Sequence, residues 1–238
     1  MIPLRLTLTR LEDPWVNRTL VWSNVIAFVV QVLLGARAEL VITSLGFIPA
    51  RLVHPSQFHY SLFEASLTLF TSLFLHGGFV HLIGNMIYLH VFGNAVEGEL
   101  GHSRYFLFYT AGGTIGSLTH TMLFPHSTIP SIGASGSIAA ILGAFLVLHP
   151  KAKIVTLLPL VVYWAMIEVP AALLLPVWLG MQFLNGMAAL AAAHSTEEVA
   201  GIAWWAHIGG FLFGALLGAI TRRRGVRLEA APSEPQQT

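Results

Sequence analysis

The feature that most limits how this chain can fold is a series of apolar runs, each of a length suited to crossing a lipid bilayer. These runs fall at residues 19–36, 79–96, 104–123, 135–149, 172–192 and 202–221. A helix that spans the hydrocarbon core needs about 20 mainly apolar residues. Only 10% of the 238 residues are charged, whereas soluble domains carry about 25%. The sequence therefore predicts a polytopic membrane protein.

The lysine and arginine positions predict how many times the chain crosses and in which direction, because cytoplasmic loops are enriched in these residues. Six crossings with both termini in the cytoplasm place ten basic residues inside: Arg5, Arg10, Arg18, Arg104, Lys151, Lys153, Arg222, Arg223, Arg224 and Arg227. Arg37 and Arg51 remain outside. Of two further apolar stretches, 58–75 is expected in the outer interface and 154–167 as an interfacial or re-entrant piece. The predicted fold is an all-α membrane protein with six transmembrane helices.

The two ends of the chain differ in composition from the membrane domain predicted at 19–221. Residues 1–18 are charged and lack both a signal-peptide apolar core and the acid-poor character of a transit peptide, so we expect a short cytoplasmic N-terminal segment. Residues 222–238 start with arginines and continue as a polar stretch, which predicts a basic and then disordered cytoplasmic tail. The expected location is the cell (plasma) membrane, as a multi-pass protein of a prokaryotic inner membrane.

Several classes of site and partner are not expected. The chain has no cysteine, which excludes a disulfide framework and thiolate metal sites. His76, His90, His120 and His126 are mostly spread over different predicted helices and loops, so neither a metal nor another cofactor is expected. The net charge is +1 and no basic stripe with interleaved aromatics occurs, which argues against a nucleic-acid partner. The oligomeric state stays open.

Ser135 begins a fourth apolar helix that is too short for the bilayer. Its 15 residues up to His149 span about 22 Å, against about 30 Å of hydrocarbon. Since Pro150 and Lys151 follow at the cytoplasmic end, Ser135 is expected roughly 8 Å beneath the outer surface. Irregular backbone at that depth requires surrounding protein or water. The loop at 124–134 is therefore predicted to dip inward beside a wet cavity.

Polar residues of two other helices are expected at the same depth. His207 lies near the outer end of the sixth helix, and His81 and Asn85 share one face of the second because they are four apart. Polar groups inside a membrane favour a functional interpretation. A serine needs a base to become a nucleophile, and a histidine can act as one near neutral pH. With no carboxylate in the outer half of the sixth helix, we expect a Ser135–His207 dyad. Asn85, His81 and the Ser135 backbone N–H are candidate oxyanion donors.

Small residues at four-residue intervals predict that the fourth and sixth helices touch. The two rows are Ser135, Ala139 and Gly143 on the fourth helix and Gly210, Gly214 and Gly218 on the sixth. Such rows allow backbones to approach closely in lipid. If these faces meet, the side chains of Ser135 and His207 come within reach of each other.

Three segments, in this order, resemble the rhomboid intramembrane serine proteases: residues 76–85 (HGGFVHLIGN), 133–136 (GASG) and 206–210 (AHIGG). The resemblance covers about 24–221. It implies a six-helix rhomboid fold and a serine endopeptidase, a hydrolase that cleaves membrane-protein substrates near the outer end of a transmembrane helix. Its partners would be transmembrane substrates and the lipid bilayer. It assigns Ser135 as nucleophile, His207 as base, and Asn85 and His81 to the oxyanion side.

Two positions depart from the pattern of that family. Many members carry an aromatic residue one turn after the serine, stacked on the catalytic histidine, where this chain has Ala139. Tyr88, Trp204 and Trp205 are candidates to replace it. Residues 97–99 read Glu-Gly-Glu where many members have Glu-x-Arg.

The alternative hypothesis is a non-proteolytic rhomboid-like protein that binds client transmembrane helices without cleaving them. Such relatives typically lack the serine or the histidine, and this chain has both, which favours the enzyme. A transporter is disfavoured because no inverted repeat or pair of broken helices is apparent.

Overall fold

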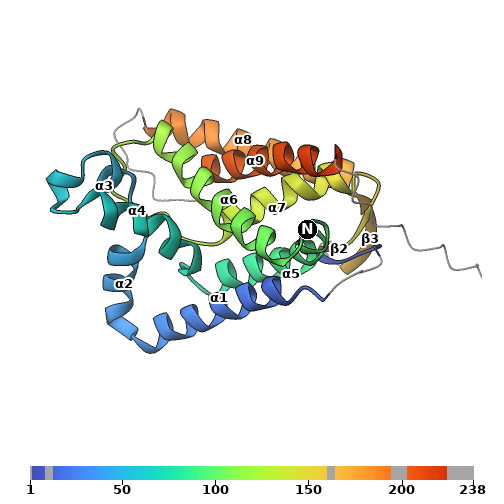
Figure 1. The fold of residues 1–238 in the computed structure, drawn as a ribbon, viewed down its shortest axis with the longest axis horizontal. Helices are drawn as coiled ribbons and strands as arrows, with labels where there is room; N and C mark the ends of the chain where they lie inside the picture. The colour runs from blue at the N-terminus through green and yellow to red at the C-terminus, as the bar shows by residue number, and fades with distance from the viewer. Residues whose placement is uncertain (1, 9–12, 160–163, 194–202, 224–238) are drawn as a thin grey trace, which may run out of the picture.

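The computed structural model describes residues 2–8, 13–159, 164–193 and 203–223, and within them the chain is mainly helical (Figure 1). The helices are α1 (Trp15–Leu33), α2 (Ala38–Leu45), α3 (Pro49–Val53), α4 (Leu62–Thr71), α5 (Phe79–Leu100), α6 (His102–Leu123), α7 (Ser135–Leu148), α8 (Ala171–Ala193) and α9 (Trp204–Arg223). Short 3₁₀ turns occur at Gly35–Arg37, Pro55–Phe58 and Ser72–Phe74. Arg10, Arg224, Arg227 and most of the predicted tail lie outside the described residues.

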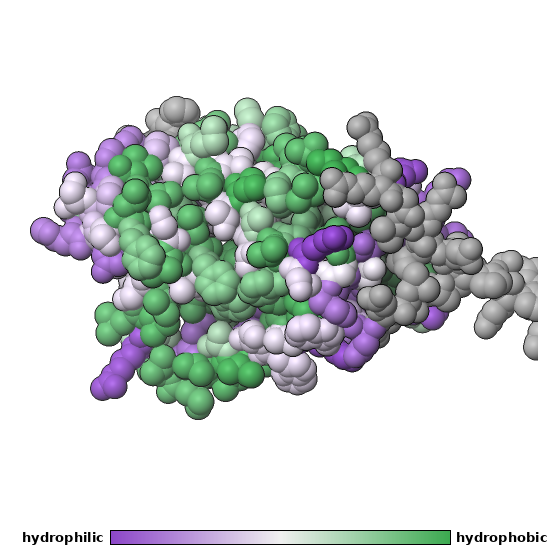
Figure 2. Space-filling model, viewed as in Figure 1, coloured by the Kyte–Doolittle hydropathy of each residue, from purple (hydrophilic) through white to green (hydrophobic). Residues whose placement is uncertain are grey.

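Helices occupy all six positions at which the sequence predicts a crossing, namely α1 and α5 to α9. Four of them, α1, α5, α8 and α9, are long and apolar enough to span a membrane. Helix α7 has only 14 residues, and α6 has 22 but includes many polar residues and glycines. Apolar side chains cover the middle of the molecule, with hydrophilic ones gathered towards its two ends (Figure 2). The chain is thus a membrane protein with several apolar helices, four of them long enough to span a bilayer, while six crossings and cytoplasmic termini stay predictions.

The expectation of an all-α chain is wrong at one end of the molecule, where three strands form an antiparallel sheet. The strands are β1 (Ile2–Leu6), β2 (Lys153–Pro159) and β3 (Trp164–Pro170), in the order β1-β2-β3. The described residues of the stretch 154–167, which was expected as an interfacial or re-entrant piece, lie in the paired strands β2 and β3. Its β-branched run favours an extended chain. The predicted N-terminal segment supplies the third strand, with Ile2 opposite Leu157.

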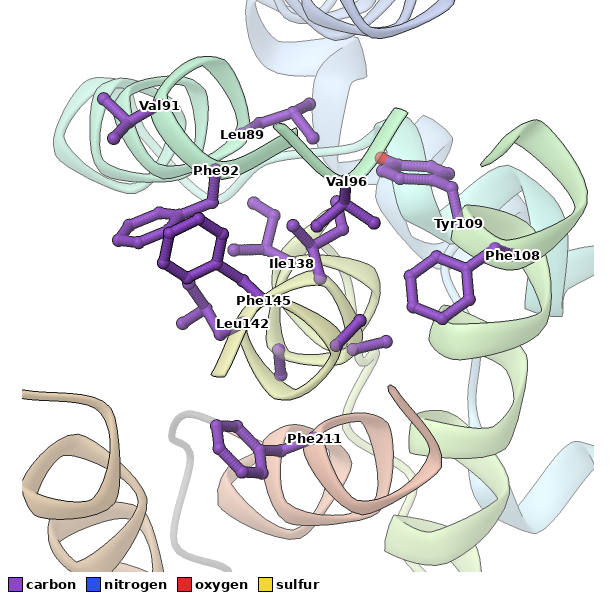
Figure 3. Packing of buried hydrophobic residues seen from close by; sticks show 14 of the residues in the cluster. Leu89, Val91, Phe92, Val96, Phe108, Tyr109, Ile138, Leu142, Phe145 and Phe211 are labelled. Atoms are coloured by element: carbon purple, nitrogen blue, oxygen red, sulfur yellow. The ribbon is translucent and has the colours of Figure 1, made fainter. Parts of the chain in front are cut away.

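Helix α7 forms the centre of the helical packing, and each residue from Gly136 to Phe145 is buried. Figure 3 shows it surrounded by side chains from α5, α6 and α9, including Phe92, Tyr109 and Phe211. Phe92 and Phe145 meet edge to face with ring centroids 5.1 Å apart, a favourable arrangement for aromatic pairs. A short apolar helix can be stable here because protein surrounds it.

Glu97, in the segment that departs from the rhomboid pattern, joins three helices at the end of α5. Its fully buried carboxylate accepts hydrogen bonds from the backbone N–H groups of Val16 (3.0 Å) and Asn17 (2.7 Å). These are N–H groups of the first turn of α1, which have no partner inside their own helix and favour a negative charge. His102 of α6 contacts the same carboxylate at 2.6 Å. Glu97 therefore fixes the start of α1 against α5 and α6.

The chain between α1 and α5 lies at the opposite end of the molecule from the sheet (Figure 1). The stretch 58–75 contains α4, which begins with a capping box between Ser61 and Glu64; its place in the membrane interface stays a prediction. Phe47 pairs with Ser131 through two backbone hydrogen bonds. This pairing attaches the region before α5 to the loop that leads into α7.

Candidate active site

Ser135 and His207 meet where α7 and α9 begin. Ser135 is the first residue of α7, and His207 is the fourth residue of α9. Ser135 Oγ lies 2.8 Å from His207 Nε2, a hydrogen-bond distance. His207 is buried, and Ser135 is partly exposed. The expected proximity of these two side chains is confirmed.

Close backbone contact between α7 and α9 brings the two side chains together. A Cβ atom at Gly210 would overlap the carbonyl oxygen of Gly136, and one at Gly214 would overlap that of Ala140. At Gly218 it would lie 3.0 Å from Ala144 Cα. The predicted glycine row of α9 is correct. On α7 the opposing residues include 136, 140 and 144. The predicted row also faces α9, since Ala139 Cβ lies 3.4 Å from a Cβ built at Gly210 and a Cβ at Gly143 would overlap the carbonyl oxygen of Phe211.

The other ring nitrogen of His207 has a partner on α8. His207 Nδ1 lies 2.8 Å from Gln182 Oε1. The Gln182 side-chain NH₂ donates to the carbonyl oxygen of Trp178 at 3.3 Å, which orients the amide with its oxygen towards the ring. An amide oxygen can only accept, so Nδ1 carries the proton of a neutral imidazole and Nε2 is free to accept from Ser135. This is the form of the ring that a general base requires.

Asn85 and His81 project from the first turns of α5 towards the same loop. His76, just before α5, contacts Asn85 Nδ2 through its Nε2 at 3.0 Å. The His76 backbone N–H and carbonyl are both bound by the Gln31 side-chain amide of α1, at 3.0 and 3.1 Å. Burial is the main cause that lowers the pKa of His76 to about 4, so its ring is neutral at pH 7 and can accept from Asn85. His76 and Gln31 thus orient Asn85.

Gly133 connects His81 and Asn85 to the nucleophile. Its φ of +118° is a conformation that L residues rarely adopt. A Cβ there would lie 2.8 Å from His81 Nε2 and 3.4 Å from Asn85 Nδ2. The Gly77 backbone N–H donates to His81 Nδ1 at 3.4 Å, which leaves Nε2 as the protonated nitrogen. Two side-chain donors therefore lie against the backbone two residues before Ser135.

All four predicted site residues line one cavity of about 1290 Å³. The loop at 124–133 forms much of its wall, as expected for a loop that dips beside a cavity. Sites for small ligands commonly measure about 300–1,000 Å³, so this one has room for a larger group such as a peptide segment. In the described part of the chain, no three His, Asp or Glu side chains gather in a way that could hold a metal ion.

Comparison with known proteins identifies the family. The family model described as "Rhomboid domain" matches residues 64–224, more than half of the chain. The chain belongs to the rhomboid family. It is 31% identical over 176 residues to "Rhomboid protein 1, mitochondrial" of Saccharomyces cerevisiae, covering 70% of this chain and 46% of that protein.

Other rhomboid relatives match over shorter segments. "Presenilin-associated rhomboid-like protein A, mitochondrial" of Danio rerio is 30% identical over 62% of this chain and 36% of its own length. "Rhomboid protease GluP" of Bacillus subtilis is 42% identical over 33% of this chain and 15% of its own length. The chain spans less than half the length of each of these relatives. Their names include mitochondrial and bacterial proteins, which gives no support to a prokaryotic cell membrane in particular.

The ring of His207 in this rhomboid chain is flanked by tryptophans instead of an aromatic residue at position 139. Trp178 of α8 lies at a tilt of 33° with its ring centroid 6.0 Å away, and Trp204 meets the ring edge to face at 6.1 Å. Of the candidates named from the sequence, Trp204 contacts the histidine. Trp205 donates to the Gly186 carbonyl instead, and Tyr88 stacks on Phe92.

Gln182, Trp178 and the supporting role of His76 are site features that were not predicted from the sequence. Gln182 had a usable signal, because a polar amide within an apolar spanning helix is costly and favours a functional interpretation. Trp178 had no such signal in the sequence, since an aromatic residue in a spanning helix can equally face lipid.

Proposed function

We propose that this chain is an intramembrane serine endopeptidase that cleaves membrane-protein substrates near the outer end of a transmembrane helix. The observation that carries the proposal is the 2.8 Å hydrogen bond between Ser135 Oγ and His207 Nε2 at the wall of a cavity. Membership of the rhomboid family, in which some relatives are named proteases, supports it. The substrates would be membrane proteins within the bilayer.

In the proposed reaction, Ser135 Oγ attacks the carbonyl carbon of the scissile peptide while its proton passes to His207 Nε2. The carbonyl π electrons move onto the oxygen. The Ser135 N–H, unpaired within α7 as the first of the helix, and the Asn85 and His81 side chains are the proposed donors to this oxyanion. The imidazolium then protonates the leaving amine as the C–N bond breaks. Water then attacks the acyl carbon and gives a proton to His207. The bond from that carbon to Ser135 Oγ breaks as His207 returns the proton to Oγ, which releases the carboxylic acid and restores Ser135.

Cleavage of a single-pass substrate with a weakened helix, measured in liposomes, tests the proposal. Ser135→Ala and His207→Ala should abolish detectable cleavage, since removing a nucleophile or its base costs on the order of 10⁶ in serine proteases. Asn85→Ala should lower turnover by about 10²–10³, the usual cost of losing one oxyanion donor. A fluorophosphonate, which labels activated serines, should label the parent but not Ser135→Ala.

Ser137→Ala is the matched control. Ser137 lies two residues further along α7, and its hydroxyl has no hydrogen-bond partner in the described part of the chain. Its loss should leave cleavage and labelling near the parent level. Equal cleavage by the parent and Ser135→Ala would refute the assignment of the nucleophile. A folded parent that neither cleaves nor is labelled would favour the non-proteolytic alternative, in which the cavity only binds client helices.

A further inference from the structure

We propose that Gln182 is a positioning residue for His207, so that a Ser–His–Gln group supplied by α7, α9 and α8 carries out the reaction. The inference rests on the proposed protease function and extends it. From the sequence we expected a Ser135–His207 dyad with no third member.

The geometry around Gln182 is that of an orienting group. Its side chain is buried, with 6% of the residue's surface exposed. The amide oxygen lies 2.8 Å from His207 Nδ1, and the amide nitrogen is bound to the Trp178 carbonyl one turn earlier in the same helix. The second bond favours the orientation in which the amide oxygen faces the ring. In that orientation Gln182 binds only the tautomer of His207 that leaves Nε2 free for the serine proton.

The same contact becomes stronger during the reaction. When His207 takes the serine proton, both ring nitrogens become donors and the ring is cationic. Hydrogen bonds with one charged partner are shorter and about twice as strong as neutral ones. The Gln182 oxygen thus stabilises the imidazolium that forms with the tetrahedral intermediate, although it carries no charge of its own. Trp178 covers the ring beside it.

One face of α8 makes all of these contacts. Trp178, Gln182 and Gly186 are four residues apart and share that face. Trp178 packs on His207 and Phe211, Gln182 binds His207, and the Gly186 carbonyl accepts from Trp205 Nε1 at 3.1 Å. Helix α8 is also the least buried of the four helices long enough to span the membrane. The orientation of His207 consequently depends on how α8 lies against α9.

Two substitutions separate a positioning role from a structural one. Gln182→Leu keeps the side-chain volume and removes the acceptor, so kcat should fall by about 10- to 100-fold with little change in KM. Gln182→Glu keeps an acceptor and should restore most of the turnover. Its negative charge beside His207 would also stabilise the imidazolium. The acid limb of the pH profile of kcat/KM should therefore move to higher pH.

Asn185→Leu is the matched control, since it removes an exposed amide three residues further along α8. It should leave both kcat and the pH profile unchanged. The pH profile is decisive because a residue that only packs would not shift the limb, even if its replacement lowered the folded fraction. Thermal unfolding of each variant in detergent measures that fraction.

The outcomes distinguish this inference from the proposed function. If the parent cleaves, Ser135→Ala does not, and Gln182→Leu retains the kcat of the parent, the positioning role is refuted and the protease stands. An unshifted pH profile in Gln182→Glu, together with activity that follows the folded fraction, refutes it as well. If the parent itself neither cleaves nor reacts with the fluorophosphonate, the proposed function fails first.

Discussion

Helix α9 contacts its two neighbours α7 and α8 in opposite ways. Against α7, glycines of α9 lie on backbone carbonyl groups, and any side chain at Gly210 or Gly214 would overlap them. Against α8, the contacts are made by large side chains, with Trp178 and Gln182 on one helix and Trp205 on the other. The α7–α9 interface excludes almost any larger side chain at these glycines, whereas the α8–α9 interface can adjust through changes of side-chain rotamer.

The difference separates two requirements of the candidate site. The distance between Ser135 and His207 is set by backbone contact, which resists displacement because neither partner has a side chain that could move aside. The rotation and tautomer of the His207 ring are set by Gln182, which belongs to the more loosely packed helix. Leucine substitutions at two glycines, with a third glycine as their control, and then an ion-pair variant test this comparison in order of decreasing effect.

Gly214→Leu should have the largest effect. A Cβ there overlaps the Ala140 carbonyl oxygen, so α7 and α9 must separate. We expect a loss of about 3 kcal/mol or more in the free energy of unfolding, at or above the upper end for overpacked sites. Cleavage and fluorophosphonate labelling should disappear. Thermal unfolding in detergent and labelling of the folded fraction measure the two effects. Parent-like labelling by this variant would contradict the close contact.

Gly186→Leu should have an intermediate effect. A Cβ at this position would lie 3.2 Å from the Trp205 ring, so the larger side chain should push α8 away from α9. We expect kcat to fall about tenfold because the Gln182–His207 bond lengthens. Stability should fall by less than in Gly214→Leu. Steady-state cleavage gives kcat, with labelling rates as an independent check.

Gly180→Leu serves as the control for both glycine variants, since nothing lies within 4 Å of a Cβ built at that residue. Its activity should match that of the parent. If Gly186→Leu also behaves like the parent, the contact between α8 and α9 does not orient His207.

Lys153→Ala should have the smallest effect. Lys153 Nζ lies 2.9 Å from Glu168 Oε2, and both side chains are about half exposed. Such pairs contribute about 0–1 kcal/mol to stability. The pair joins β2 to β3 beyond the far end of α7 from Ser135, so kcat should not change. Unfolding and cleavage assays on Lys153→Ala and Glu168→Gln should agree. A clear drop in kcat in either would show that the sheet influences the site.

Much of the candidate site could be predicted from the sequence because its polar residues stand out against an apolar background. Ser135, His207, Asn85 and His81 were expected at similar depths in three helices, and the structure brings them around one cavity. The positions of the helices also follow from the apolar runs. The small residues of α9 correctly predicted a close partner. On α7 both the predicted row and the small residues one position later lie against α9, because the backbones approach closely enough for two adjacent rows to take part.

The sheet could not be predicted in the same way. Strand β1 begins at Ile2, and its partner strand runs over Lys153–Pro159. Taken alone, each strand is a short apolar or mixed segment. The backbone N–H and carbonyl groups of these strands are satisfied only when segments far apart in the sequence pair. This is why the stretch 154–167 resembled an interfacial piece when it was considered alone.

The sequence by itself determined that this chain enters a membrane, which six apolar stretches form helices, and which polar residues these helices carry. The hydropathy of the sequence is enough for these predictions, because an apolar run and a polar residue within it can both be recognised locally. Only the tertiary structure decided that Gln182 and Trp178 meet His207 and that His76 binds Asn85. In lipid, the protein-facing and lipid-facing sides of a helix such as α8 are both apolar. The face that touches a neighbour is therefore set by packing.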